Sequence, residues 1–296
     1  MKTKFQFQIP DYKKIRIIID TDAACEADDP FAIVQALLSP KAIVKAILAE
    51  HFNVEGSVER SYKEIQTILK AMDMQVPVYM GEKTQIQNVD MENISPASQF
   101  IIEEALKNDE KPLYILCQGA ITNLAVALKK APEIASKINV IWIGTHGLLE
   151  KAPFREFNAG NDVTAANLVL SSKTNLIIVP STVYTTVTVG LAELQLKVLP
   201  YGEIGKHLFT NMVDYNNSPG AGWTKGESWS LGDSPAIAIA LNPDSGHFIM
   251  HEAPFVNEDT SSSFNKGNPI VRIYTDIDSR YILEDFYAKL QINYKG

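Results

Sequence analysis

RIIIDTDAACEADDPFAIVQALL, residues 16–38, is the stretch that decides the fold of this chain of 296 residues. Three isoleucines run into a loop that holds five acids, and an apolar pattern with helical spacing begins at Phe31. This order predicts a buried strand, an acidic loop and then a helix. Open α/β sheets bind ligands just beyond the carboxyl ends of their strands, so the loop marks a candidate site.

The acids of this loop are Asp20, Asp22, Glu26, Asp28 and Asp29. Two unit charges about 4 Å apart repel by roughly 4 kcal/mol at an effective dielectric near 20. A fold that gathers these acids must therefore protonate some of them or bind a cation. Oxygen ligands without a Cys or His cluster suit Ca²⁺ or Mg²⁺. A solvated acidic loop is the alternative, and the strand-end position with its D-x-D spacing favours the metal site.

Composition restricts the partners. The formal net charge is −8 at pH 7, which argues against nucleic acid as the main partner because phosphate binding needs a basic face. The sequence has no run of about 18 apolar residues, so no membrane span is expected. The N-terminus is too polar for a signal peptide, and Cys25 and Cys117 do not indicate a disulfide framework. A cytoplasmic setting is therefore expected.

Strand-like and helical patterns alternate along the rest of the chain, after a polar lead-in at residues 1–14. This alternation predicts βαβ units and an open, mostly parallel, Rossmann-like sheet flanked by helices, in a single α/β domain. The further strands are expected at 42–49, 76–80, 112–117, 139–143, 175–179 and 270–274. The helices are expected at 31–38, 57–72, 98–107, 122–130, 162–170, 234–241 and 281–290.

Residues 211–232 differ from this pattern, because Gly, Ser and Asn dominate and Trp223 and Trp229 are embedded among them. Such a composition predicts a long loop. Long loops in compact domains often serve as lids over a site.

Four blocks of sequence resemble the inosine–uridine-preferring nucleoside hydrolase family. They are Asp20-Thr-Asp22 with Asp28-Asp29, CQGAITNLA at 117–125, REFNAGNDVTAA at 155–166 and GDSPAIAIAL at 232–241. Each block is weak alone, and their order is specific. The resemblance implies an open α/β fold with Ca²⁺ at the carboxyl end of the sheet. It also implies hydrolysis of the N-ribosidic bond of ribonucleosides to ribose and free base, by a homo-oligomer (dimer or tetramer).

The resemblance assigns roles to residues by position. Asp22 matches the metal-bound base that activates water, Asp29 matches the bidentate metal ligand, and Asp233 matches the distant ligand. Gln118 falls where a backbone carbonyl binds the metal. The positions that hold the ribose hydroxyls are matched by Asp28, Asn53, Glu156 and Asn158. The residue types suit this chemistry, because carboxylates stabilise an oxocarbenium-like transition state and can remove a proton from water.

The chain departs from the family pattern at three places. Residues 23–27 separate the second and third aspartates, where the family usually has three residues that include Pro-Gly. Gly232 stands where the family often has a leaving-group His, and Glu150 lies where it has an Asn. His51 and His146, at expected strand ends, are candidate replacements for this acid, with structural roles as the alternative. The resemblance therefore does not imply which base the protein prefers.

Aromatic faces suit a planar leaving group, so Trp223, Trp229 and Tyr184 are candidates for stacking on the base, with ordinary packing as the alternative. Cys25 within the acidic loop could suggest a nucleophile. An anionic surrounding raises the pKa of a thiol, so an inert thiol is expected there.

Two rival functions remain open. A phosphatase of the haloacid dehalogenase type would use Mg²⁺ and make Asp20 the nucleophile. Such enzymes usually carry Thr or Val two residues after the second Asp, where this chain has Ala24. A non-catalytic Ca²⁺-dependent nucleoside- or sugar-binding protein is favoured by Gly232, and the complete set of matched acids argues against it.

Overall fold

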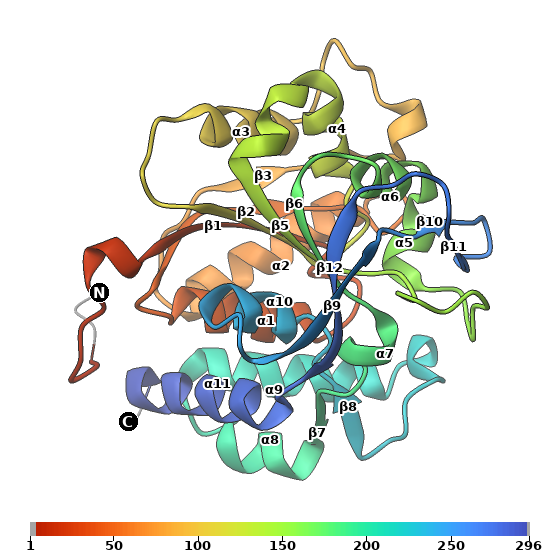
Figure 1. Cartoon of the computed structure of the whole chain (residues 1–296). Helices are drawn as coiled ribbons and strands as arrows, with labels where there is room; N and C mark the ends of the chain where they lie inside the picture. Colours follow the sequence, from red (N-terminus) through yellow and green to blue (C-terminus); the bar gives the residue numbers. More distant parts are fainter. Residues whose placement is uncertain (1–3, 295–296) are drawn as a thin grey trace.

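An eight-stranded sheet organises the chain, with the strand order β3-β2-β1-β4-β5-β6-β12-β9. In this computed structural model, which describes residues 4–294, every neighbouring pair is parallel except β12 and β9 (Figure 1). The prediction of a single α/β domain with a mostly parallel sheet is confirmed. The strands are β1 (Ile15–Thr21), β2 (Ala42–Ala49), β3 (Val78–Met80), β4 (Leu113–Cys117), β5 (Ile138–Ile143), β6 (Asn175–Val179), β9 (Gly246–Glu252) and β12 (Ile270–Ile277).

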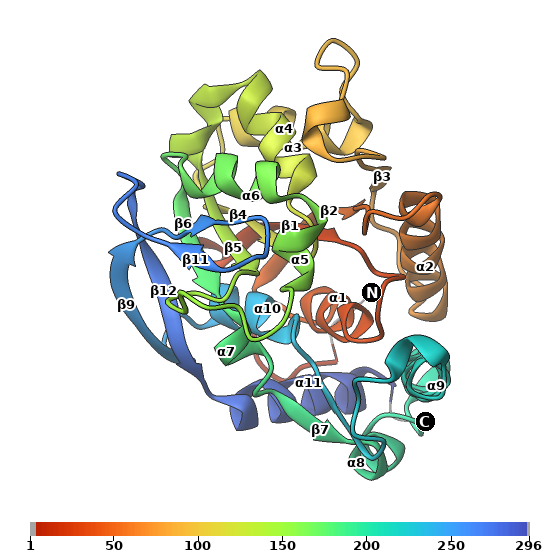
Figure 2. The same ribbon diagram turned by 90° about the vertical axis from the view of Figure 1, so that its right-hand side faces the viewer.

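Helices cover both faces of the sheet (Figures 1 and 2). One layer packs with Ile17 and Ile19 of β1 and includes α1 (Asp29–Leu37), α2 (Ser57–Ala71), α8 (Leu191–Lys197), α9 (Gly202–Asn216), α10 (Ser234–Leu241) and α11 (Ser279–Tyr294). The other layer packs with Ile18 and includes α3 (Pro96–Leu106), α4 (Thr122–Lys130) and α6 (Val163–Leu170). Short elements complete the chain: α5 (Phe157–Asn161), α7 (Ser181–Tyr184), β7 (Thr188–Gly190), β8 (Ser228–Ser230), β10 (Phe255–Val256) and β11 (Ser262–Ser263).

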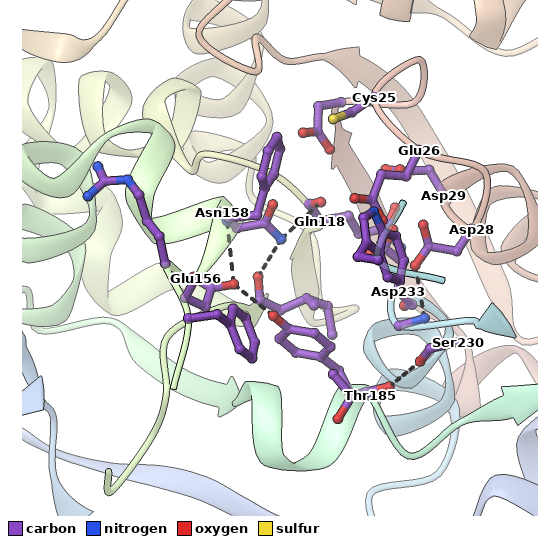
Figure 3. Close-up of a pocket in the computed structure, with 18 residues that line it drawn as sticks. Cys25, Glu26, Asp28, Asp29, Gln118, Glu156, Asn158, Thr185, Ser230 and Asp233 are labelled. Atoms are coloured by element: carbon purple, nitrogen blue, oxygen red, sulfur yellow. Dashed lines mark hydrogen bonds between the residues drawn. The ribbon is translucent and has the colours of Figure 1, made fainter. Parts of the chain in front are cut away.

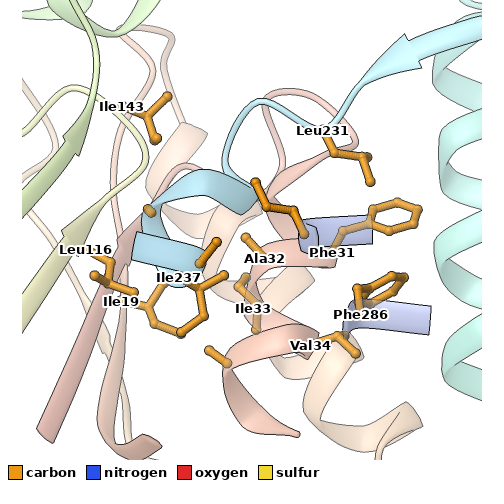
Figure 4. Close-up of a cluster of buried hydrophobic side chains, with 14 of the residues drawn as sticks. Ile19, Phe31, Ala32, Ile33, Val34, Leu116, Ile143, Leu231, Ile237 and Phe286 are labelled. Carbon is orange, nitrogen blue, oxygen red and sulfur yellow. The ribbon is translucent and has the colours of Figure 1, made fainter. Parts of the chain in front are cut away.

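Strand β1 is buried along its whole length. Successive side chains of a strand point to opposite faces, so its isoleucines fill both layers of the core. Figure 4 shows Ile19 and Leu116 of the sheet beside Ile33 of α1 and Ile237 of α10. Full burial of such a side chain contributes roughly 1.5–3 kcal/mol. The core therefore fixes both ends of the acidic loop between β1 and α1.

The segment 211–232 is more ordered than its composition predicts. Residues 211–216 end helix α9, and β8 pairs with β7. Segment 217–227 is irregular apart from a short 3-10 helix at Pro219–Ala221. Helix α9 continues because Ile204, Leu208 and Met212, four residues apart, bury one face of it. The sequence patterns also missed α8 and β9. The expected lead-in, residues 1–14, precedes β1. Its residues 1–3 lie outside the residues that the structure describes.

Within residues 4–294, the structure contains no helix that is both long and apolar enough to cross a membrane.

Candidate functional site

A cavity of about 490 Å³ lies at the carboxyl end of the sheet. Its walls come from the acidic loop, residues 154–158, the end of α7, the segment around Trp223 and residues 230–233 before α10. Figure 3 shows Glu26, Asp28, Asp29 and Asp233 on one side and Glu156 and Asn158 on the other. The topology produces this meeting, since the loops after parallel strands gather at one edge of the sheet.

Two helix starts hold three of the acids of the cavity. Asp28 is the N-cap residue of α1, Asp29 is its first residue, and Asp233 is the N-cap residue of α10. One oxygen from each of the three lies within 4.8 Å of the others. Thr21 Oγ1 donates a hydrogen bond to Asp29 Oδ1. The positive ends of two helix dipoles therefore face a carboxylate cluster, which offsets part of its mutual repulsion.

The metal set implied by the family resemblance was Asp22, Asp29, Gln118 and Asp233. The structure groups Asp28 with Asp29 and Asp233 as the closest set of oxygens. Asp22 and Gln118 line the same cavity.

These residues fit a hard cation. Asp22 Oδ2 and Gln118 Oε1 are buried without a hydrogen-bond partner in the described chain. Burial, followed by the neighbouring charge of Asp28, raises the pKa of Asp29 to about 8. Burial and then the charges of Asp29 and Asp28 raise the pKa of Asp233 well above its usual range. Repulsion among these oxygen ligands destabilises their charged form. Ca²⁺ prefers oxygen ligands, and its binding would relieve this repulsion.

Glu50 is a buried acid that the sequence analysis did not assign a role. It follows β2, and its Oε2 has no hydrogen-bond partner within the described residues. A Cβ atom on Gly119 would lie 3.0 Å from Glu50 Oε2 and 3.1 Å from Asp22 Cγ. Both carboxyl groups therefore pack against one glycine. The signal that could have found Glu50 is its position at the end of the strand that neighbours β1.

Glu156 and Asn158, which the resemblance assigns to the ribose hydroxyls, both line the cavity. Glu156 accepts hydrogen bonds from the backbone N–H groups of Thr145 (3.0 Å) and Ala159 (2.8 Å) and from Tyr184 Oη (3.0 Å). Asn158 Nδ2 donates to the carbonyl oxygen of Ile143 at 2.9 Å. Both side chains are thus held in fixed orientations.

Asn53 lies elsewhere. It is exposed, it has a φ of 55°, and it lines a separate surface groove at the start of α2 instead of the main cavity. The structure does not bring it to the other expected ribose-binding residues.

Neither candidate histidine lines the cavity. His51 is fully buried, with Nε2 2.8 Å from Thr122 Oγ1 and Nδ1 accepting from the backbone N–H of Asn53. His146 is also fully buried, with Nδ1 2.7 Å from Ser181 Oγ and Nε2 2.8 Å from the carbonyl oxygen of Phe154. Their ring nitrogens all have protein partners, which supports structural roles for both.

Among the aromatic candidates, Trp223 and Tyr184 line the cavity. Trp229 is buried behind them, with its ring centroid 5.1 Å from that of Trp223. Phe154 and Phe157 also line the cavity and were not singled out from the sequence, because single aromatic residues in a polar stretch give no periodic signal.

Cys25 lies in the cavity wall next to the acids. Burial and then the charge of Asp22 raise the pKa of its thiol. A thiol that resists ionisation is a poor nucleophile, which agrees with the expected inert role.

The open sheet and the acidic cavity beyond its carboxyl edge define an α/β protein with a small-molecule site suited to a cation. The family described as "Inosine-uridine preferring nucleoside hydrolase" matches residues 17–284, and the chain belongs to this family.

Two relatives and two solved structures are similar to this chain. Pyrimidine-specific ribonucleoside hydrolases RihA of Salmonella schwarzengrund (strain CVM19633) and Salmonella agona (strain SL483) are each 27% identical over 288 residues, covering 87% of this chain and 88% of theirs. A plant nucleoside hydrolase, the PpNRh1 enzyme, has a similar fold (TM-score 0.80, 19% identity, 95% of this chain and 99% of that chain). So does the purine-preferring ribonucleoside hydrolase of Gardnerella vaginalis (TM-score 0.79, 22% identity, the same two coverages).

Proposed function

We propose that this protein hydrolyses the N-glycosidic bond of ribonucleosides, or of related ribosides, to ribose and free base in a Ca²⁺-dependent reaction. The observation that carries the proposal is the cluster of Asp28, Asp29 and Asp233 at two helix starts, with the partnerless Oδ2 of Asp22 in the same cavity. The relatives named above as ribonucleoside hydrolases support the reaction type.

The proposed division of labour follows from where the groups lie. Asp28, Asp29 and Asp233 would hold Ca²⁺, which when bound would orient the ribose hydroxyls and the attacking water. Asp22 removes the proton from that water as its oxygen approaches C1′. The bond from C1′ to the base breaks with its electron pair leaving on the base. Carboxylates around the ribose stabilise the positive charge that develops on the sugar.

The rival phosphatase is less well supported. It requires Asp20 as nucleophile, yet Asp20 is fully buried, accepts a hydrogen bond from Asn123 Nδ2 at 2.8 Å and does not line the cavity. A non-catalytic binding protein would use the same cavity, and only turnover distinguishes it from a hydrolase.

The test is a panel of ribosides carrying purine, pyrimidine, nicotinamide and p-nitrophenyl groups, assayed for released reducing sugar. Release of ribose that a chelator abolishes and added Ca²⁺ restores supports the proposal. Tight binding of these ribosides without any release would favour the binding protein. Release of phosphate from a phosphate ester, with none of ribose, would favour the phosphatase.

Segment 217–227 is proposed as an active-site lid. Its Trp223 is 50% exposed and reaches the cavity wall, and its ring packs edge-on against Trp229. Closure over a bound riboside would bury the indole and exclude water from the site.

A homo-oligomer is also proposed, with β9 as its contact. This strand pairs with β12 on one side and forms the end of the sheet, at the margin of the molecule in Figure 2. Phe248, Ile249 and Met250 on it are exposed. An exposed apolar edge strand is a template for pairing with a second strand. A cytoplasmic setting stays a prediction, which the free thiols of Cys25 and Cys117 favour.

A further inference from the structure

Within the described residues no histidine lines the cavity, and the position next to Asp233 is Gly232. The site therefore has no imidazole, the side chain that most often acts as a general acid. A neutral base that leaves C1′ with the bonding electron pair becomes an anion unless an acid protonates it. A base that carries a positive charge on the glycosidic nitrogen leaves as a neutral molecule and needs no proton.

The charges around the cavity favour such a cation. Its wall includes six carboxyl groups, those of Asp22, Glu26, Asp28, Asp29, Glu156 and Asp233. Its one basic residue within the described chain, Arg155, donates hydrogen bonds from its guanidinium to the carbonyl oxygens of Gly160 and Glu258. This cation is thus tied to the backbone. A Ca²⁺ ion would bring two positive charges to a wall that holds six carboxyl groups.

The aromatic part of the wall adds a second attraction. Phe154, Phe157 and Trp223 are 50%, 45% and 50% exposed and line the cavity together with Tyr184. Aromatic faces attract cations, and they do so more strongly where water is excluded. Glu26 lines the same cavity from the acidic loop, on the side of Asp28 and Asp29 (Figure 3), and this loop is two residues longer than in the family pattern. Aromatic rings with a carboxyl group form a recognised type of cage for an organic cation.

We propose that this site takes ribosides whose base is cationic, such as N-ribosyl pyridiniums or N-alkylated purine ribosides, with Glu26 as a specificity-determining residue. The inference rests on the proposed hydrolase function. In the step itself, the oxygen of water forms a bond to C1′ and its proton passes to Asp22. The C1′–N bond breaks, and its electron pair neutralises the ring nitrogen of the departing base.

The first test uses the unaltered protein and three substrates: nicotinamide riboside, uridine and p-nitrophenyl β-ribofuranoside. We expect turnover of nicotinamide riboside and of the p-nitrophenyl riboside, whose leaving group needs no acid, and at least about tenfold lower kcat/KM for uridine. Faster cleavage of uridine than of nicotinamide riboside overturns the inference and leaves the proposed function standing. Absence of turnover for all three overturns both.

Because nicotinamide riboside is intrinsically labile, binding is tested separately. 1-Methylnicotinamide and nicotinamide differ by one methyl group and one positive charge. Both compounds are tested as inhibitors of p-nitrophenyl riboside hydrolysis. The Ki of cationic 1-methylnicotinamide is expected to be about tenfold lower than that of neutral nicotinamide. Equal values, or tighter binding of the neutral amide, contradict the inference.

Glu26→Gln keeps the shape of the side chain and removes its charge. It is expected to lower kcat/KM for nicotinamide riboside by about tenfold more than kcat/KM for uridine, a ratio in which intrinsic lability cancels. Glu133 is an exposed acid in the 3-10 helix Pro132–Lys137 between α4 and β5. Glu133→Gln is the matched control and should leave that ratio unchanged. A larger loss with uridine would instead identify Glu26 as an acid for neutral bases and overturn the inference.

Discussion

The backbone N–H of Gly232 donates a hydrogen bond to Oδ2 of Asp28 across 2.9 Å, which ties the start of α10 to the acidic loop. A side chain at this position could be accommodated only if its neighbours shifted. A Cβ atom at position 232 would lie 3.2 Å from Asp28 Oδ2 and 3.2 Å from Cδ2 of Tyr184. This close approach explains physically why the position beside Asp233 holds glycine here, because a larger residue would displace either the acid or the ring.

Gly232→Ala is therefore expected to weaken Ca²⁺ binding by about tenfold or more, because the shifted Asp28 oxygen leaves its cluster with Asp29 and Asp233. Isothermal titration calorimetry with Ca²⁺ measures this directly. Gly222→Ala is the matched control, since a Cβ there meets nothing within 4 Å. Equal Ca²⁺ affinity in both variants would show that the Gly232–Asp28 contact does not position the site.

Removal of metal should make stability depend on pH in a particular direction. Burial raises the pKa of Asp28 to about 6 and that of Asp29 to about 8, whereas an unfolded Asp titrates near pH ~4. Between these values the folded protein binds more protons than the unfolded chain, so the free energy of unfolding falls as pH rises. In chelator, the melting temperature is expected to fall from pH 5 to pH 8.

Calcium should reverse this trend. Its binding requires ionised carboxylates and releases protons, so Ca²⁺ affinity is expected to be at least about tenfold higher at pH 8 than at pH 6. Differential scanning fluorimetry at several pH values, with EDTA or with Ca²⁺, checks both statements. A melting temperature in EDTA that rises from pH 5 to pH 8 would show that these acids are ionised without a metal.

Asp22→Asn tests the proposed base. The amide keeps the size of the side chain and cannot accept a proton from water, so kcat should fall at least about a hundredfold. Affinity for ribose, measured by calorimetry in the presence of Ca²⁺, should be retained. A variant with turnover close to that of the original protein would remove Asp22 from this role.

The proposed lid contains its own protease site, because Lys225 is exposed within segment 217–227. If the segment closes over ligand, trypsin should cut after Lys225 several-fold more slowly when ribose and Ca²⁺ are present. Lys225→Gln identifies the cleavage, since the corresponding fragments should disappear. Equal cutting rates with and without ribose would count against closure.

Much of the fold could be predicted from the sequence because the patterns that indicate strands and helices are local. The three isoleucines of β1 and the helical spacing from Phe31 each report burial through periodicity, and the structure confirms the strand, the loop and the helix. Gly232, from the GDSPAIAIAL block, contacts Asp28 of the acidic loop. Periodicity does not indicate how close two segments that are far apart in the sequence lie in the structure. It did not show that Asn53 and His51 lie outside the cavity.

The sequence patterns likewise did not predict β9, an edge strand of the sheet whose residues Phe248, Ile249 and Met250 are exposed. Pairing of two antiparallel β9 strands about Ile249 would place Phe248 opposite Met250 of the partner subunit and cover this edge of the sheet. Met250→Lys should therefore shift the protein to a smaller species in multi-angle light scattering. Leu196→Lys, at an exposed position on α8, is the control and should not. If both variants keep the mass of the original oligomer, the subunits meet elsewhere.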